Sequence, residues 1–344
     1  MNQPAVPMSL PPRAAGPSSS AEGGAPPETL TPLEAAQQAR AVIDAVATVF
    51  RGKRPVVELV MAAVLARGHV LLEDVPGVGK TTLARAFAHV LGLTQQRIQF
   101  ASDLMPADIT GVGVWNQQSS RFEFQPGPIF CHVLLADEIN RTTPRTQSAL
   151  LESMAEGHVT VDGQTHLLPT PFVVLATQNP REHHGTYPLP ESQLDRFLFR
   201  LSIGYPEAAT ERQLVREHGA PMRLHHLPRL CDERRVQALV AAAAEVRVAD
   251  PVLDYMMALV ERTREPARFE LGLSTRAAIG LYRAVQSVAL VQGRDFATPD
   301  DVQRVFVAVA GHRVIPAGQG ANTPDRSQVE SWLLGLLESV LPPS

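Results

Sequence analysis

Short apolar runs, separated by stretches with helical spacing, dominate the chain between residues 69 and 203. The runs at 69–72, 133–136 and 172–177 are apolar at nearly every position, which is typical of strands buried on both faces of a parallel sheet. Two further short strands are expected at 97–100 and 199–203, where apolar and polar residues alternate. This alternation of strands and helices predicts an α/β fold, a three-layer sandwich around a mainly parallel five-stranded sheet.

Other patterned segments are predicted to lie outside this sheet. Residues 111–125 hold two nearly alternating segments around a polar turn, which predicts an inserted β-hairpin. Residues 158–168 predict a second, tight hairpin. Upstream, a capping box between Thr31 and Glu34 begins one helix, and a second helix is expected over 55–66.

The two ends of the chain have a different character. Residues 1–30 are rich in Pro, Ala, Gly and Ser, have little to bury, and are expected to be a disordered tail. We assign residues 31–206 to the α/β domain and residues 207–344 to an all-helical domain. The helices expected in that last domain cover 207–218, 232–246, 250–265, 274–291, 299–312 and 326–341.

The strongest chemical signal follows the first strand. Gly77 and Gly79 precede Lys80 and Thr81, and a helix-forming stretch begins at residue 82. This is the context of a phosphate-binding loop, in which backbone N–H groups and a helix N-terminus surround an anion. Lys80 would reach the β- and γ-phosphates of ATP, and the Thr81 hydroxyl would bind Mg²⁺. The predicted nucleotide-binding residues are Asp74, Val75, Pro76, Gly77, Val78, Gly79, Lys80, Thr81 and Thr82.

One position departs from the strict phosphate-loop pattern. That pattern has a glycine six residues before the lysine, and this chain has Asp74 there. A glycine turn followed by a surface lysine is therefore an alternative interpretation of the stretch taken alone.

Two later strands also end in polar residues. Asp137 and Glu138 follow the apolar run 133–136, and carboxylates at such a strand end are costly to bury unless a cation is near. Asp137 is therefore a candidate Mg²⁺ ligand beside Thr81, and Glu138 is a candidate to polarise the attacking water. Asn179, at the tip of the next long strand, can hydrogen-bond the γ-phosphate or that water. The alternatives are a solvated acidic strand end and an asparagine that only forms a turn.

Composition and charge limit the remaining function classes. A formal net charge of −4 and a pI of about 6.3 provide no basic footprint for nucleic acid. No apolar run is long enough to cross a bilayer and the N-terminus lacks a secretory signal pattern, so we expect a cytoplasmic protein. The two cysteines, Cys131 and Cys231, are expected to be buried free thiols.

Together these motifs resemble those of the AAA+ ATPases, and their amino-acid sequences resemble those of the MoxR family. The resemblance covers residues 31–315, and Asp74 is usual in the phosphate loop of that family. It rests on Leu-Leu-Glu-Asp-Val-Pro-Gly-Val-Gly-Lys-Thr-Thr (71–82), Pro-Gly-Pro-Ile-Phe (126–130), Leu-Leu-Ala-Asp-Glu-Ile-Asn-Arg (134–141), Gln-Ser-Ala-Leu-Leu-Glu-Ser-Met (147–154), Ala-Thr-Gln-Asn-Pro (176–180) and Leu-Pro-Glu-Ser-Gln-Leu-Asp-Arg-Phe (189–197).

The resemblance implies a role for each residue of the predicted site. Lys80 and Thr81 resemble the Walker A pair, and Asp137 and Glu138 resemble the Walker B pair. Asn179 resembles sensor 1. The 111–125 hairpin fits the insert in helix 2 that this clade carries.

The resemblance also implies roles for two arginines. Arg196, within Leu-Asp-Arg-Phe, resembles the arginine finger that reaches the nucleotide of a neighbouring subunit, with Arg141 and Arg181 as rival candidates. Arg276 resembles sensor 2 on the lid helix, which would move toward or away from the nucleotide. The alternatives are a local salt bridge for Arg196 and an ordinary helix charge for Arg276.

The function implied by the family is ATP hydrolysis coupled to chaperone-like maturation of client proteins. Family members form hexameric rings and act with von Willebrand factor A domain proteins, often in insertion of metal cofactors. ATP and Mg²⁺ would bind at the strand ends, between the α/β domain and a helical lid. An AAA+ motor acting on DNA is disfavoured by the acidic pI, and a nucleotide-gated scaffold without turnover is disfavoured by the intact Glu138.

Overall fold

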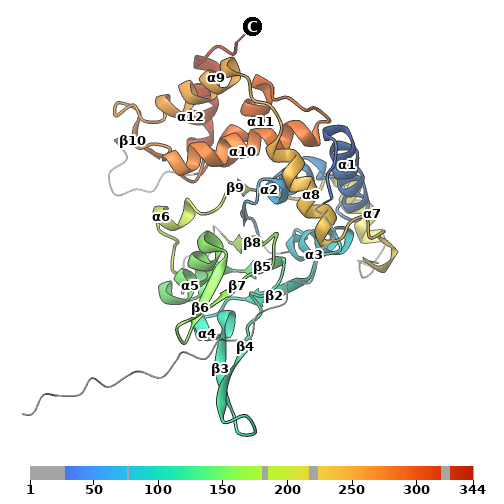
Figure 1. The fold of residues 1–344 in the computed structure, drawn as a ribbon. Helices are drawn as coiled ribbons and strands as arrows, with labels where there is room; N and C mark the ends of the chain where they lie inside the picture. Colours follow the sequence, from blue (N-terminus) through green and yellow to red (C-terminus); the bar gives the residue numbers. More distant parts are fainter. Residues whose placement is uncertain (1–27, 76, 180–184, 217–223, 319–325, 344) are drawn as a thin grey trace, which may run out of the picture.

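The computed structural model describes residues 28–75, 77–179, 185–216, 224–318 and 326–343. Most of the predicted tail at 1–30 therefore lies outside the described residues, as do Pro76 and Arg181. The described chain forms a central sheet with helices on both faces, and the C-terminal helices gather at one end of the molecule (Figure 1).

The central sheet has five strands in the order β2-β5-β8-β1-β9, and every neighbouring pair is parallel. Val70 pairs with Leu175 on one side and with Phe199 on the other, so β1 lies inside the sheet. The predicted α/β sandwich with a five-stranded parallel sheet is confirmed. The strands are β1 (Val70–Glu73), β2 (Gln95–Gln99), β5 (Val133–Asp137), β8 (Val173–Gln178) and β9 (Phe199–Leu201).

Side chains along β1 alternate between two apolar cores. Val70 and Leu72 lie in one core and Leu71 lies in the other. Because both faces of the strand are covered, every position of its central run has to be apolar. The first core is covered by α1 (Pro32–Val49), α2 (Arg54–Leu65) and α3 (Lys80–Val90), and the second by α4 (Pro106–Thr110) and α5 (Pro144–Glu156).

Two antiparallel hairpins are added to the sheet domain, and both were predicted from the sequence. The hairpin of β3 (Gly111–Asn116) and β4 (Arg121–Pro126) projects from the end of the molecule farthest from the C-terminal helices (Figure 1). Trp115 and Phe122 pair across it, with ring centroids 5.2 Å apart. The second hairpin consists of β6 (His158–Val161) and β7 (Gln164–Leu167).

The C-terminal part is mostly helical, but the prediction that it is all-helical was wrong. Phe269–Leu271 (β10) pairs antiparallel with Ile315–Pro316 (β11). Strands of three and two residues are too short to give an alternating pattern, so the sequence predicted helices alone. The helices are α7 (Ala208–Arg216), α8 (Glu233–Ala244), α9 (Asp250–Arg262), α10 (Thr275–Val291), α11 (Pro299–Ala310) and α12 (Arg326–Ser339).

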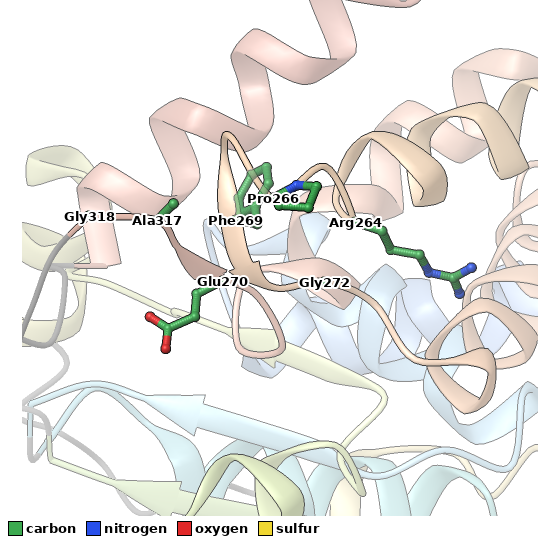
Figure 2. Close-up of a pocket in the computed structure, with 7 residues that line it drawn as sticks. All are labelled: Arg264, Pro266, Phe269, Glu270, Gly272, Ala317 and Gly318. Atoms are coloured by element: carbon green, nitrogen blue, oxygen red, sulfur yellow. The ribbon is translucent and has the colours of Figure 1, made fainter.

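The short β10-β11 pair borders an open pocket of about 450 Å³ (Figure 2). The side chains of Arg264 and Glu270 point in different directions there, and the Arg264 Nε donates to the Leu273 carbonyl at 2.9 Å. No residue of the predicted nucleotide site lines this pocket. It is therefore not the candidate functional site.

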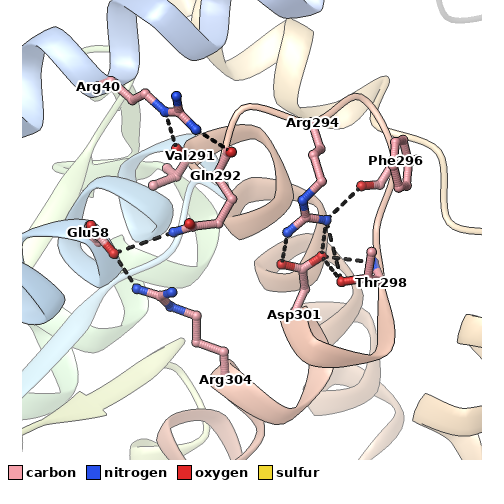
Figure 3. Close-up of polar contacts among 9 residues, drawn as sticks. All are labelled: Arg40, Glu58, Val291, Gln292, Arg294, Phe296, Thr298, Asp301 and Arg304. Carbon is pink, nitrogen blue, oxygen red and sulfur yellow. Dashed lines mark hydrogen bonds and ion pairs between the residues drawn. The ribbon is translucent and has the colours of Figure 1, made fainter. Parts of the chain in front are cut away.

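The N-terminal helices connect the sheet to the C-terminal helices. α10 packs against both α1 and α2 within the first apolar core. Glu58 of α2 pairs with Arg304 of α11 and accepts a hydrogen bond from Gln292 at 3.5 Å (Figure 3). Arg40 of α1 donates to the carbonyl of Val291 at 3.3 Å. One apolar core therefore continues across the predicted boundary at residue 206.

Both cysteine thiols are buried and neither forms a disulfide, as predicted. Burial raises the pKa of the Cys131 thiol to about 12, so the group stays protonated at neutral pH. Among the helices that the structure describes, none is long and apolar enough to cross a membrane.

Gly68 joins α2 to β1 where there is no room for a side chain. An added Cβ would lie 2.4 Å from Cδ2 and 2.5 Å from Cβ of the buried Leu198. Gly68→Ala should therefore lower the free energy of unfolding by about 1–3 kcal/mol, as overpacking does. Urea denaturation measures the change.

A matched control is Gly335→Ala in α12, where an added Cβ meets nothing within 4 Å. That variant should be neutral or more stable by up to about 1 kcal/mol, because alanine favours the helix. Equal stability of the two variants would contradict the packing of Gly68 against Leu198.

Candidate nucleotide site

Three neighbouring strands carry the predicted chemistry to one edge of the sheet. In the order β5-β8-β1 they end at Asp137, Gln178 and Glu73. Parallel strands have their carboxyl ends at the same edge. Glu138, Asn179 and the phosphate loop after Glu73 therefore leave the sheet side by side, although they are far apart in the sequence.

The loop between β1 and α3 has a backbone suited to an anion. Gly77 and Gly79 have φ angles of +88° and +98°, which residues with a Cβ rarely adopt. An added Cβ at Gly77 would meet nothing within 4 Å, whereas one at Gly79 would lie 3.1 Å from the Phe50 ring. Gly79 is the N-cap of α3 and provides no side-chain cap. The first N–H groups of α3, at the positive end of its dipole, can therefore bind phosphate.

Lys80 is the first residue of α3, and its side chain turns back over the loop. Its Nζ donates to the carbonyl oxygen of Asp74 at 2.6 Å. Burial lowers the pKa of Lys80, and the negative charges of Asp74, Asp137 and Glu138 oppose that shift. A half-buried ammonium near three carboxylates is not in the environment of a surface lysine, and it can neutralise an incoming phosphate.

The contacts of the Asp74 side chain give a structural reason for an aspartate at the position where the strict phosphate-loop pattern has a glycine. Its buried carboxylate accepts hydrogen bonds from the Ser202 hydroxyl and the Gly204 N–H, both at 3.0 Å, and from the Ile203 N–H. A glycine could not make these bonds. The Asp74 side chain therefore fixes the segment that leaves β9 toward the C-terminal helices, while its carbonyl contacts Lys80.

Asp137 ends β5 with a carboxylate held from two neighbouring strands. Oδ1 accepts from the Thr177 hydroxyl of β8 and Oδ2 accepts from Arg97 of β2, both at 2.6 Å. Thr81 lies in the first turn of α3. A carboxylate and a hydroxyl are oxygen ligands of the kind Mg²⁺ binds, usually together with substrate phosphates. Asp137 and Thr81 thus fit Mg²⁺ in their chemistry.

Glu138 has a left-handed backbone conformation, with φ of +59°. Such a conformation is uncommon for a residue with a side chain and often occurs at functional sites. The Glu138 N–H donates to the Thr177 hydroxyl at 2.9 Å. Its Oε2 accepts from Gln99 at 2.9 Å and pairs with Arg141 at 3.0 Å. The carboxylate is therefore held at the sheet edge from both sides.

Sequence analysis missed Thr177, Arg97 and Gln99. Each lies on a strand, and only the order β2-β5-β8 brings all of them to the acidic pair at the end of β5. The available signal was that Thr177 stands near the end of β8, where polar residues replace apolar ones, whereas β2 is polar at four of its five positions and gave no such signal for Gln99.

The candidate finger arginines lie in different places. Arg141 pairs with Glu138 of its own chain. Arg196 lies just before β9, and its Nη1 donates to the Leu151 carbonyl of α5 at 2.5 Å. Its Nε is buried without a hydrogen-bond partner in the described part of the chain. Arg181 is among the residues that are not described.

Arg196 and Arg276 share the opposite edge of the sheet. The Leu198 N–H donates to the His69 carbonyl at 2.8 Å, just before β1 begins, so this segment lies at the amino edge. The Ser274 hydroxyl, at the start of α10, donates to Asp195 at 3.2 Å. Arg276, exposed in the first turn of α10, therefore lies near Arg196 and not over the phosphate loop of its own chain.

This position of Arg276 differs from the expectation that the lid carries it over the nucleotide. The direction of α10 follows from its packing against α1 and α2, with Val291 at one end near Arg40 and Ser274 at the other near Asp195. Figure 1 shows the same arrangement, with α6 (Glu191–Leu194) below one end of α10 and α1 beside the other.

Two sequence families match the regions just described. The ATPase family associated with various cellular activities (AAA) matches residues 69–199, and the AAA lid domain matches residues 261–332. These ranges contain β1, β2, β5 and β8 of the central sheet, the first residue of β9, and the helices α10 and α11. Fold and site together define an AAA+ ATPase with a helical lid.

Comparison with individual relatives identifies the family within the AAA+ ATPases. The chain is 47% identical over 264 residues to the uncharacterized protein YeaC of Bacillus subtilis, covering 77% of this chain and 82% of YeaC. It is 43% identical over 274 residues to the chaperone MoxR1 of Mycobacterium tuberculosis, covering 77% and 72%. A solved structure from Cytophaga hutchinsonii, described as a candidate ATPase, matches with a TM-score of 0.82 at 32% identity, covering 91% and 97%. The chain belongs to the MoxR-type AAA+ ATPases.

The contacts of Asp74 predict a stability defect that is separate from catalysis. Asp74→Ala would leave two buried N–H groups, at Ile203 and Gly204, without their acceptor. The free energy of unfolding should fall by about 1–3 kcal/mol for each of these groups. Asp74→Asn keeps one oxygen acceptor and should lose less. Urea denaturation of both variants is the measurement, and an unchanged midpoint for Asp74→Ala would contradict the assigned role.

Proposed function

We propose that this protein hydrolyses ATP with Mg²⁺ and couples turnover to the maturation or assembly of partner proteins, as a chaperone-like remodeller. The observation that carries the proposal is the convergence of Lys80, Asp137, Glu138 and Asn179 at one edge of adjacent parallel strands. A half-buried lysine, two acids and an amide around a glycine loop suit phosphoryl transfer to water.

Each residue of the site has a defined task in this mechanism. Lys80 and the N–H groups of the loop bind and orient the phosphates. Thr81 and Asp137 would hold Mg²⁺, which would supply charge neutralisation at the phosphates. Phosphoryl transfer depends on positioning and charge neutralisation and needs no covalent intermediate. Glu138 orients the attacking water and accepts its proton, and Asn179 hydrogen-bonds the γ-phosphate or that water.

We further propose that the site is completed by a second copy of the chain in a homo-oligomeric ring, with six subunits as the family implies. Arg196 and Arg276 lie at the amino edge of the sheet, and Lys80 and Asp137 lie at the carboxyl edge. A strand of four residues separates these edges by about 13 Å. An arginine at the amino edge is therefore better placed to serve a neighbouring subunit than its own.

The proposed partners are a client protein and a von Willebrand factor A domain protein. The chaperone role is supported by 43% identity to a protein named chaperone MoxR1. No nucleic-acid partner is proposed, because the formal net charge is −4. Hydrolysis that DNA stimulates and that weakens steeply with salt would instead favour a DNA motor.

Two substitutions separate nucleotide binding from turnover. Lys80→Ala should abolish ATP binding, because the lost charge-assisted phosphate contact alone contributes about 1.5–3 kcal/mol before the Mg²⁺ geometry is counted. Glu138→Gln should bind ATP normally and hydrolyse it very slowly, because the amide keeps the shape and loses the charge. Fluorescent-nucleotide titration and phosphate release measure the two effects. If the parent protein binds ATP without releasing phosphate, it is a nucleotide-gated scaffold.

A mixing experiment tests Arg196 and the assembly together. Arg196→Ala should keep ATP binding and lose hydrolysis, because a finger arginine contributes about 10³-fold or more. Lys80→Ala keeps its finger and loses its own pocket. Mixing the two inactive proteins creates interfaces with one intact pocket and one intact finger, so phosphate release should recover partly. If there is no recovery although subunit exchange is demonstrated, Arg196 is not a trans finger, and Arg141 and Arg181 should be tested next.

A further inference from the structure

Asp195, next to the proposed finger Arg196, contacts the lid from two sides. Its Oδ1 pairs with the Arg313 Nε at 2.8 Å, and its Oδ2 accepts from the Ser274 hydroxyl at 3.2 Å. Ser274 caps α10, since its hydroxyl accepts from the Ala277 N–H at 3.0 Å. One carboxylate thus joins the segment before β9 to two separate parts of the lid.

Arg313 makes further contacts between the lid and the segment before β9. Its side chain is only 5% exposed, and its Nη2 donates to the carbonyls of Asp195 at 3.1 Å and Phe197 at 2.5 Å. Nη1 donates to the Leu198 carbonyl at 3.1 Å. The guanidinium therefore binds the backbone on both sides of Arg196 and pairs with the neighbouring carboxylate. A buried arginine with this many partners holds a fixed geometry.

This geometry leaves Arg196 between two anchored residues. Its neighbours Asp195 and Phe197 are both bound to Arg313 of the lid, and its own guanidinium rests on the Leu151 carbonyl of α5. A shift of the lid relative to the sheet moves both neighbours, so it also changes the direction in which Arg196 points. Displacements of about 1 Å are enough to change catalytic rates strongly.

We propose that Asp195 is a positioning residue through which the lid sets the orientation of Arg196 toward the neighbouring subunit's nucleotide. The inference rests on the proposed function, because it assumes that Arg196 acts in trans. It goes beyond that function by making turnover depend on how the lid is seated against the sheet. Asp195 itself touches neither nucleotide nor metal.

The first test compares Asp195→Asn with a matched lid variant, Asp301→Asn. Asp301 is also a carboxylate paired with an arginine, Arg294 at 2.6 Å, although its side chain is 2% exposed and that of Asp195 is 22% exposed. All partners of Asp301 among the described residues lie within the lid (Figure 3). Asp195→Asn should lower kcat on the order of 100-fold with little change in the KM for ATP. Asp301→Asn should lower the Tm and leave kcat unchanged below that temperature. Equal kcat values for Asp195→Asn and the parent would overturn the proposal.

If Asp195→Asn does not fold, a second pair of variants tests whether Asp195 positions Arg196. Ser274→Ala and Thr298→Ala each remove the hydroxyl of the N-cap residue of a lid helix, Ser274 losing its bond from the Ala277 N–H and Thr298 its bond to Asp301. Only Ser274 contacts Asp195. Ser274→Ala should therefore lower kcat several-fold more than Thr298→Ala. Matching kcat values for these two variants would also overturn the proposal.

A mixing assay separates positioning from general damage. Asp195→Asn keeps its own pocket, so Lys80→Ala subunits, with their correctly held Arg196, should restore part of its phosphate release. A merely structural defect would not recover, and absence of recovery with proven subunit exchange would overturn the inference. If the parent protein releases no phosphate, the proposed function fails together with the inference. If the parent is active and only the Asp195 results differ, the inference alone fails.

Discussion

The candidate site depends on the parallel register of β5, β8 and β1. Val133 pairs with Val173, and Val70 pairs with Leu175, so the three strands end within a residue or two of one another. A parallel sheet then delivers everything that follows those ends to one edge. If β8 were displaced from its place between β5 and β1, Asn179 would no longer lie between the acidic pair and the phosphate loop. The position of β1 within the sheet is stabilised by its apolar side chains, which are buried in the two cores on opposite faces of the sheet.

The same register divides the subunit into two edges with different chemistry. The candidate phosphate-binding residues and the acidic residues lie at the carboxyl edge, and Arg196 and the start of α10 lie at the amino edge. A single chain therefore has the candidate phosphate loop at one edge of the sheet and Arg196 and Arg276 at the other. Such an arrangement can close into a ring by repeated head-to-tail contacts.

Two aspartates, the buried Asp74 and the partly exposed Asp195, connect the sheet with the helices beyond it. Asp74 binds backbone N–H groups after β9, and Asp195 binds Arg313 and Ser274 of the lid. Removing either carboxylate leaves buried donors or a buried cation without a partner, which costs more than the contact itself contributes. Asp74 thus connects the phosphate loop to the segment after β9. Asp195 connects the segment of the proposed finger to the lid. Lid position and site geometry are linked through these side chains.

The sequence by itself determined the elements and the chemical residues. Apolar runs of four to six residues predicted β1, β5 and β8, and the glycines, Lys80 and the Asp137-Glu138 pair predicted a phosphate site, because local patterning and residue type carry that information. Only the tertiary structure decided how Asp74 is used and that Thr177 holds Asp137. It also decided that Arg276 lies at the edge opposite the phosphate loop. These features depend on strand order and on the packing direction of α10, which join residues far apart in the chain and leave no local trace in the sequence.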